Sequence, residues 1–300
     1  MNCKAVDDPL RPERGHVRGQ IAALIIVATL TAGQSGAVVQ APVPLSSAAD
    51  PSAPIFPSLV ADPKEPEFFA TYLWQRSPRL AAKLGSVGFG QTIGVVRARD
   101  WQLSIAAGVF SQFDLSSSTA DLMNTDYLIG LPLAYRGGST ALRLRVYHQS
   151  SHLGDEYILH ARAQRVDLSF EAAELLVARE LAHWRVYGGA EYMFTHSPSD
   201  LKPGVLHAGL EYHQPGSLVR LGRLAAGRLV AALDGRSVQD RGWQIGWSFV
   251  TGLELADPLV LPGSGWRWSV QLKGYSGPSP YGEFFRDRVS SLGFGLGLTL

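Results

Sequence analysis

Residues 126–136, DYLIGLPLAYR, alternate between large apolar side chains and mostly small or polar ones, and this alternation decides the fold class. The apolar positions are Tyr127, Ile129, Leu131, Leu133 and Tyr135. Successive side chains of a β-strand point to opposite faces, so the segment has one apolar face. The pattern recurs at 184–194, 204–213, 266–273 and 292–300, and no helical period competes with it. The sequence therefore predicts an all-β protein.

Alternating strands fit either a soluble sandwich or a transmembrane β-barrel. Aromatic residues lie at both ends of the apolar faces, as in Tyr127 with Tyr135 and Trp184 with Tyr192, where interfacial girdles are expected. The apolar segments approach the roughly 9–11 residues of a membrane-spanning strand. We therefore predict an antiparallel transmembrane β-barrel and keep the sandwich as the alternative.

Eleven segments have clear strand patterns, and the lengths of their connections indicate a twelfth. The segments are 86–97, 101–113, 125–136, 140–149, 165–178, 183–194, 204–213, 226–234, 242–254, 266–275 and 288–300. Outer-membrane barrels have short periplasmic turns and long outer loops. Because the turns at 97–100, 136–139 and 180–183 are short, a further strand at 67–75 is needed to keep them periplasmic. The expected barrel has about twelve strands.

The N-terminal region has the pattern of a signal peptide. An apolar run, 21–33, follows Arg11, Arg14 and Arg18 and is too short to span a bilayer as a helix. It predicts a cleaved secretory signal peptide over residues 1–41, with a buried core helix as the alternative.

The remaining chain divides by composition. Residues 42–66 are rich in Pro and Ala and are expected to be a periplasmic leader, followed by the barrel domain at 67–300. Such a chain is expected in the outer membrane of a Gram-negative bacterium, with membrane lipids and the barrel-assembly machinery as partners. The 27 Lys and Arg nearly balance the 26 Asp and Glu, which argues against a nucleic-acid partner recruited by bulk charge. The single cysteine, Cys3, excludes a disulfide framework and a thiolate metal cluster.

The face opposite the apolar one is rich in charge. We expect a lumenal network made of Arg143, Arg145, Asp167, Glu171, Arg185, Glu191 and Glu211, in which neighbouring strands neutralise one another. Mixed signs do not select one ion, so they favour a lumen plugged by salt-bridged side chains over a selective conduit.

One dense cluster of reactive side chains lies at 147–156, YHQSSHLGDE. His148 and Ser150 are two apart on a strand and share a face, so the imidazole could activate the hydroxyl as a base. The apolar Val166 and Leu168 are expected opposite them, so Asp155 or Glu156 would have to fold back as the third member.

If the strand ends before Ser150, Ser151 with His152 becomes an equal candidate pair. Two other interpretations remain open. The same cluster could bind a hard cation through Asp155, Glu156 and a backbone carbonyl, or it could be a hydrogen-bonded loop that plugs the outer mouth. The sequence indicates no particular cofactor and no dedicated metal site.

This cluster, together with FPSLVADPKEP (56–66), WQLSIAAGVFSQFDL (101–115) and NTDYLIGLPLAYR (124–136), resembles the bacterial domain of unknown function 1207 family over residues 56–300. That resemblance implies an exported, barrel-like envelope protein and no particular activity. The His-x-Ser spacing by itself is similar to that of outer-membrane phospholipases and lipid A deacylases, which implies a lipid ester hydrolase as an alternative to a structural barrel. A small-solute channel or a metal-binding barrel is a further alternative.

Overall fold

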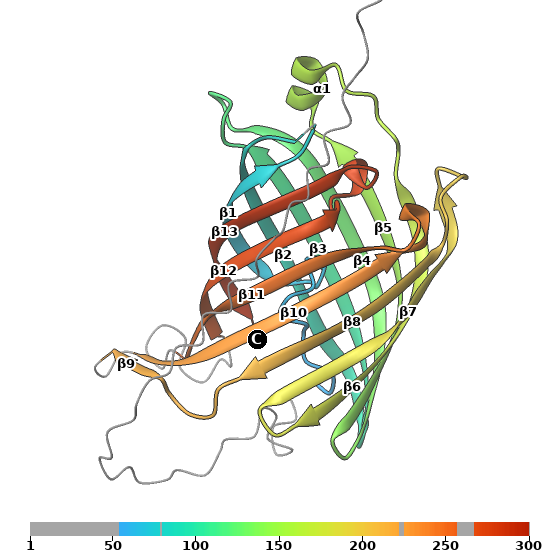
Figure 1. Cartoon of the computed structure of the whole chain (residues 1–300). Coiled ribbons are helices and arrows are strands. Elements are labelled where there is room, and N and C mark those ends of the chain that lie inside the picture. The colour runs from blue at the N-terminus through green and yellow to red at the C-terminus, as the bar shows by residue number, and fades with distance from the viewer. Residues whose placement is uncertain (1–53, 79, 222–224, 257–266, 300) are drawn as a thin grey trace, which may run out of the picture. The chain divides into compact units, whose positions relative to one another are not determined.

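The computed structural model describes residues 54–299 except 79, 222–224 and 257–266. In this part of the chain the strands run antiparallel around a barrel (Figure 1). They are β1 (Phe68–Arg76), β2 (Lys83–Ala98), β3 (Trp101–Asp114), β4 (Asp121–Gly137), β5 (Thr140–Leu153), β6 (Ser169–Leu181), β7 (Trp184–Ser197), β8 (Gly204–His213), β9 (Val219–Leu221), β10 (Ala225–Val238), β11 (Gln244–Ala256), β12 (Arg267–Pro278) and β13 (Arg288–Thr299).

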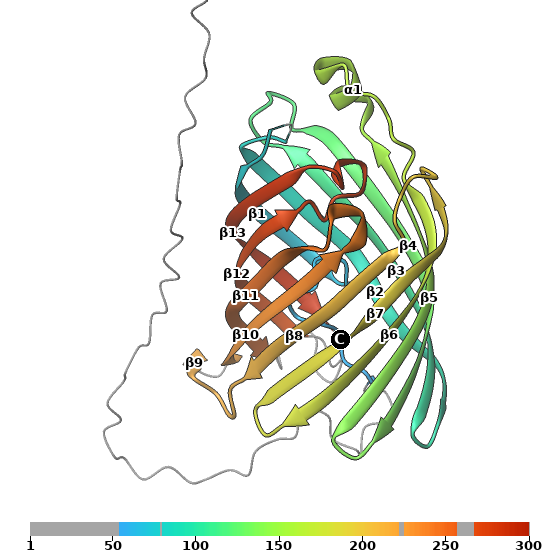
Figure 2. The ribbon, with the colours of Figure 1, turned by 45° about the vertical axis from the view of Figure 1, so that its right-hand side comes forward.

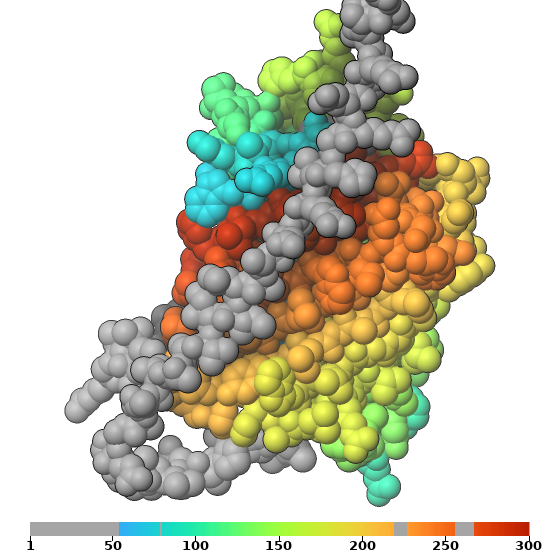
Figure 3. Space-filling view, in the orientation of Figure 1, coloured from blue at the N-terminus to red at the C-terminus, as the bar shows by residue number. Residues whose placement is uncertain are grey.

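The barrel is closed by pairing between its first and last strands. Phe68 of β1 pairs with Leu298 of β13, and the register continues to Arg76 with Ser290. Of the thirteen strands, β9 is a three-residue extension that pairs only with the start of β10, which leaves twelve strands in the barrel wall. The predicted antiparallel barrel of about twelve strands is confirmed. Figure 3 shows β7, β8 and β10 to β13 as adjacent tilted bands across one face.

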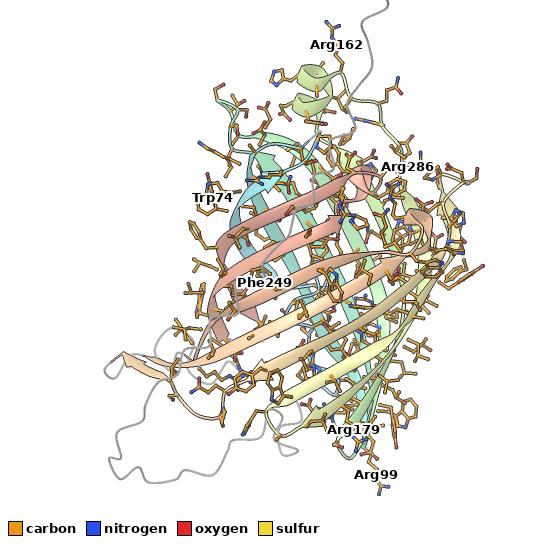
Figure 4. All side chains as sticks on the ribbon, viewed as in Figure 1. Trp74, Arg99, Arg162, Arg179, Phe249 and Arg286 are labelled. Atoms are coloured by element: carbon orange, nitrogen blue, oxygen red, sulfur yellow. The ribbon has the colours of Figure 1, made fainter. Side chains whose placement is uncertain are left out.

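The outer face of the barrel exposes the apolar series that predicted it. Ile129 is 59% exposed and Leu296 is 53% exposed, as expected for side chains that face lipid rather than a protein core. Aromatic residues gather toward the two edges of this band. Trp101 lies against Tyr135, with ring centroids 4.7 Å apart, near one edge, and Trp74 projects from the outer face near the other (Figure 4).

The two ends of the barrel differ in their connections. Three short hairpins lie at one end of the barrel, which we call the hairpin end. They join β2 to β3 at 99–100, β4 to β5 at 138–139 and β6 to β7 at 182–183. The opposite end, which we call the loop end, carries helix α1 (Asp155–Ala161) and the 3-10 turns η1 (Gln239–Arg241) and η2 (Gly282–Phe284) (Figure 2). None of the helices in the described ranges has the length and apolar character needed to span a bilayer.

Residues 54–66 lie inside the barrel and form a plug. Ile55, Leu59 and Ala61 are almost fully buried, and so are the polar residues Asp62 and Glu65. The expected periplasmic leader, residues 42–66, is described only from Pro54, and that part fills the lumen instead of extending away from it. The predicted signal peptide, residues 1–41, lies outside the described residues.

The plug is held by polar groups from many strands. The carbonyl of Ile55 accepts from Arg136 near the hairpin end, whereas Lys64 forms an ion pair with Asp126 closer to the loop end. Between them, Val60 N donates to Glu211 over 2.9 Å. A backbone segment without regular structure must satisfy its polar groups when buried, and here the barrel wall supplies those partners.

Candidate functional site

The candidate site lies on the outer face of strands β5 and β6, toward the loop end. The antiparallel register places Glu171 of β6 opposite His148 of β5, and Ser169 opposite Ser150. His148 Nδ1 lies 2.9 Å from Glu171 Oε1, which is within hydrogen-bond distance. The two side chains are 41% and 39% exposed, so the pair is accessible from outside the wall. Ser150 follows His148 by two positions and shares its face.

Glu171 was expected in the lumen, and this expectation is wrong. The segment 165–178 alternates with the opposite parity, so Phe170, Ala172 and Glu174 face inward while Glu171 faces outward. The reason is the partner strand. Arg143 and Arg145 of β5 pair with Glu174, at 3.0 and 3.1 Å, and this contact requires Glu174 to be lumenal.

The expected positions of three neighbours in this segment are also corrected. Asp167, expected in the lumen, is exposed before β6 begins. Leu168, expected on the lipid face, is only 5% exposed and faces inward. Val166, expected beside it, precedes the strand, and its N–H donates to Glu283 over 2.8 Å. The residue opposite His148 is therefore an acid and not an apolar side chain.

A β-bulge enlarges the polar area around this pair. The register between β6 and β7 shifts after Glu171, so that Glu171 pairs with Thr195 and Ser169 pairs with Ser197. Met193 is buried, and without the extra residue Thr195 would share its inward face; instead Thr195 is exposed. We call the resulting outward group the outer polar patch. It consists of His148, Ser150, Ser169, Glu171, Thr195 and Ser197.

The patch lies at the depth of an aromatic girdle. Tyr127 of β4 pairs directly with Ser150 and is 46% exposed on the same outer face. On the other side of the patch, Tyr192 and Phe194 of β7 are 59% and 55% exposed. Aromatic girdles mark the interface between the hydrocarbon core and the headgroups. The Ser150 hydroxyl therefore lies at the level of an exposed aromatic residue on the outer face.

The other residues of the 147–156 cluster do not join the pair. Ser151 points into the lumen and is 1% exposed, where its hydroxyl bonds to Asn124 and accepts from Glu283 N. His152 is exposed, with its ring 5.9 Å from that of Tyr127. Asp155 and Glu156 lie exposed on α1, and Asp155 pairs with Arg165 over 3.1 Å.

The lumenal face of the same strands is tightly cross-linked. Asp126 accepts from Ser151, from Asn124 and from the backbone N–H of Gly282, which ties the β12–β13 loop into the mouth. In that loop, burial, followed by the negative charge of Asp126, raises the pKa of the Tyr281 hydroxyl, which therefore stays protonated.

The other expected lumenal charges lie in the lumen. Arg185 pairs with Glu211, and its guanidinium also donates to the plug carbonyls of Pro57 and Ser58. Glu191 pairs with Arg236 over 2.8 Å. Because partners of both signs surround the plug, the charges are neutralised in place. Within the described ranges, no group of three or more His, Cys, Asp or Glu is arranged to hold a metal ion.

These features define an outer-membrane β-barrel with a plugged lumen and a polar patch on its lipid-facing wall. The chain belongs to the family described as "protein of unknown function (DUF1207)", whose model matches residues 28–299. No curated protein matches the sequence.

Similar solved structures share the barrel at low sequence identity. Outer membrane phospholipase A from Escherichia coli has a TM-score of 0.53 and 14% identity, with 79% of this chain and 93% of that chain covered. The outer membrane phospholipase dimer of Salmonella typhi with bound calcium has a TM-score of 0.52 and 15% identity over the same shares. LpxR from Salmonella typhimurium is more distant, with a TM-score of 0.39, 11% identity, and 72% and 88% covered. The first two likenesses show the fold.

Proposed function

We propose that this protein is a lipid ester hydrolase whose nucleophile is Ser150, with His148 as general base and Glu171 as the acid that orients it. The observation that carries the proposal is the 2.9 Å contact between His148 Nδ1 and Glu171 Oε1, on the face that also presents Ser150. A carboxylate that accepts from Nδ1–H fixes the tautomer in which Nε2 is free to take a proton. A fold-level likeness to barrels named as phospholipases is compatible with this proposal.

The chemistry follows from the three positions. The Ser150 hydroxyl attacks the ester carbonyl carbon while His148 Nε2 accepts its proton. The carbonyl re-forms as the ester C–O bond breaks, and the leaving alcohol takes the proton from the imidazolium. His148 then takes a proton from a water molecule, which attacks the acyl-serine. The fatty acid is released and the Ser150 hydroxyl is restored. The negative charge of Glu171 stabilises the imidazolium in both steps.

The setting supports a membrane lipid as substrate. The patch lies between Tyr127 and Tyr192, at the interfacial depth, and opens to the lipid side of the wall. A small-solute channel has less support, because residues 54–66 occupy the lumen. We also propose that residues 1–41 direct export, that the barrel-assembly machinery inserts the chain, and that the loop end faces outward.

The test is hydrolysis by the purified barrel in phospholipid vesicles, with products read by mass spectrometry. Ser150→Ala is expected to lower the rate by three orders of magnitude or more, because removal of a triad nucleophile leaves only roughly 10³–10⁴-fold catalysis over water. Ser151→Ala is the matched control, since that hydroxyl faces the lumen, and its rate is expected to change less than about threefold. Activity retained in Ser150→Ala, or a wild type inactive on every envelope lipid, overturns the proposal.

A further inference from the structure

A shallow groove lies on the outer face of the barrel beside His148. It has a volume of about 290 Å³ and crosses the wall from β5 toward β2. Its lining side chains are apolar apart from the imidazole and the tyrosine hydroxyl, and the outward ones are Phe89, Ala107, Val109, Tyr127, Ile129 and His148. The groove therefore begins at the general base of the outer polar patch and continues over an apolar surface.

A single small residue creates the depression. The outward positions of β3 are Trp101, Leu103, Ile105, Ala107 and Val109. Ala107 is the smallest of them, and it pairs with Ile129 of β4, which in turn pairs with His148 of β5. Ile129, directly opposite Ala107, and Phe89, which pairs with Val109 and so lies diagonal to Ala107, are 59% and 60% exposed, so both side chains rise above the alanine methyl. Ala107 forms the floor of the groove. From there the groove runs past Ile129 to the imidazole of His148.

The surface around the groove indicates which kind of molecule contacts it. It lies in the exposed apolar band of the wall, directly below Tyr127, where the protein contacts hydrocarbon rather than water. The neighbouring molecules at this depth are the acyl chains of bilayer lipids. An ester group at the level of Ser150 would have its carbonyl in the polar patch and its acyl chain in the apolar band.

We propose that the groove binds one long acyl chain, that of the ester cleaved at Ser150, and that it selects long-chain esters over short ones. This inference rests on the proposed hydrolase function and adds the substrate class. A long chain fills the groove and buries apolar surface against Ala107 and Ile129, whereas a short chain ends before reaching them. Filling the groove should remove the preference without disturbing the triad.

The first experiment measures binding without catalysis. Ser150→Ala barrels are placed in phosphatidylcholine vesicles that contain a trace of phosphatidylcholine with a diazirine on one acyl chain. After irradiation, label on the peptides of Phe89 and Val109 is compared with label on β11. The expected result is an enrichment that Ala107→Phe, added to Ser150→Ala, removes. Ala190→Phe is the matched control, because Ala190 is an outward alanine of β7 outside the groove.

The second experiment measures selectivity in the active barrel. The ratio of hydrolysis of long-chain to short-chain phosphatidylcholine is expected to fall at least tenfold in Ala107→Phe and to stay unchanged in Ala190→Phe. An active Ala107→Phe variant that keeps its label and its ratio overturns the groove and leaves the hydrolase standing. A wild type that cleaves no ester overturns the hydrolase, and the acyl-chain selectivity with it, while the labelling still reports whether the groove holds a chain.

Discussion

At the residue scale, two glutamates three positions apart on β6 have opposite surroundings. Glu171 is half-exposed beside His148, and Glu174 is fully buried beside Arg143 and Arg145. Odd and even positions of a strand point to opposite faces, so the same residue type serves a surface site in one case and a lumenal network in the other. The two positions therefore separate an effect on activity from an effect on stability.

Glu171→Gln is expected to lower the rate of lipid hydrolysis by at least about a hundredfold. The amide keeps the shape of the side chain but removes the charge that stabilises the imidazolium, and it can reverse the His148 tautomer. Initial rates on vesicles, with Thr195→Val as a control on the same outer patch, check this expectation. A Glu171→Gln enzyme as fast as the wild type would remove Glu171 from the proposed triad.

Glu174→Gln is expected to destabilise the barrel by about 3–5 kcal/mol, because it leaves two buried guanidinium groups with one fewer counter-charge. Glu171→Gln should change stability by less than about 0.5 kcal/mol, since its side chain is partly exposed. Urea unfolding in lipid vesicles, followed by tryptophan fluorescence, measures both. Equal stabilities of the two variants would show that the lumenal contacts contribute little.

For the proposed triad, the sequence indicated that His148 and Ser150 share a face, but it did not indicate Glu171 as their neighbour. His148 and Ser150 are local, and two-residue spacing alone places them on one face. Glu171 depends on the register between β5 and β6 across a loop that contains α1, and a shift of one residue exchanges the two faces of a strand. The pairing of Arg145 with Glu174, rather than with Glu171, is the contact that decides which residues of β6 face the lumen. An expectation of that pairing would have placed Glu171 on the outer face.

At the scale of the elements, three two-residue turns, at 99–100, 138–139 and 182–183, mark one end of the barrel. Arg99 and Arg179 project at the hairpin end, whereas Arg162 and Arg286 lie at the loop end (Figure 4). The strand pattern predicted the short hairpins, because alternating segments separated by short turns define hairpins. It did not predict the bulge after Glu171, since an extra residue in one strand changes no local composition.

Cysteine labelling tests the orientation of these ends. Ser139→Cys lies exposed in the turn between β4 and β5, and Gln164→Cys lies exposed in the loop between α1 and β6. On intact cells, an impermeant maleimide is expected to label Gln164→Cys and to leave Ser139→Cys unmodified until the outer membrane is opened. The reverse pattern would place the outer polar patch at the periplasmic interface.

At the scale of the whole molecule, the wall was predictable and its contents were not. Alternation, girdles and turn lengths all report on the sheet, so the antiparallel barrel follows from local patterns. The plug has no such period. Residues 54–66 contain four prolines, at positions 54, 57, 63 and 66, and resemble an exposed linker in composition. Asp62 and Glu65 are nevertheless buried, and each forms an ion pair with an arginine of a distant strand.

Removal of the plug is expected to convert a closed barrel into a conducting one. In planar lipid bilayers the wild type should show no steady ion current, whereas deletion of residues 54–66 should open a stable conductance through the charged lumen. A mobility shift on boiling in semi-native gels verifies that each form is a folded barrel. A steady current through the wild type, or a folded but silent deletion variant, would contradict a plug that blocks ions.

The pairing of β1 with β13 has a consequence for how the chain assembles. These strands are separated by nearly the whole barrel sequence, so their pairing is the most non-local contact in the wall. We expect this pairing to form late in folding. Segment 54–66 directly precedes β1 and lies inside the ring that this seam closes. Once the seam has closed, the barrel wall surrounds the segment on all sides. The segment can then leave only through one of the two ends of the barrel. The closed wall therefore helps to retain the segment, in addition to the contacts that bind it.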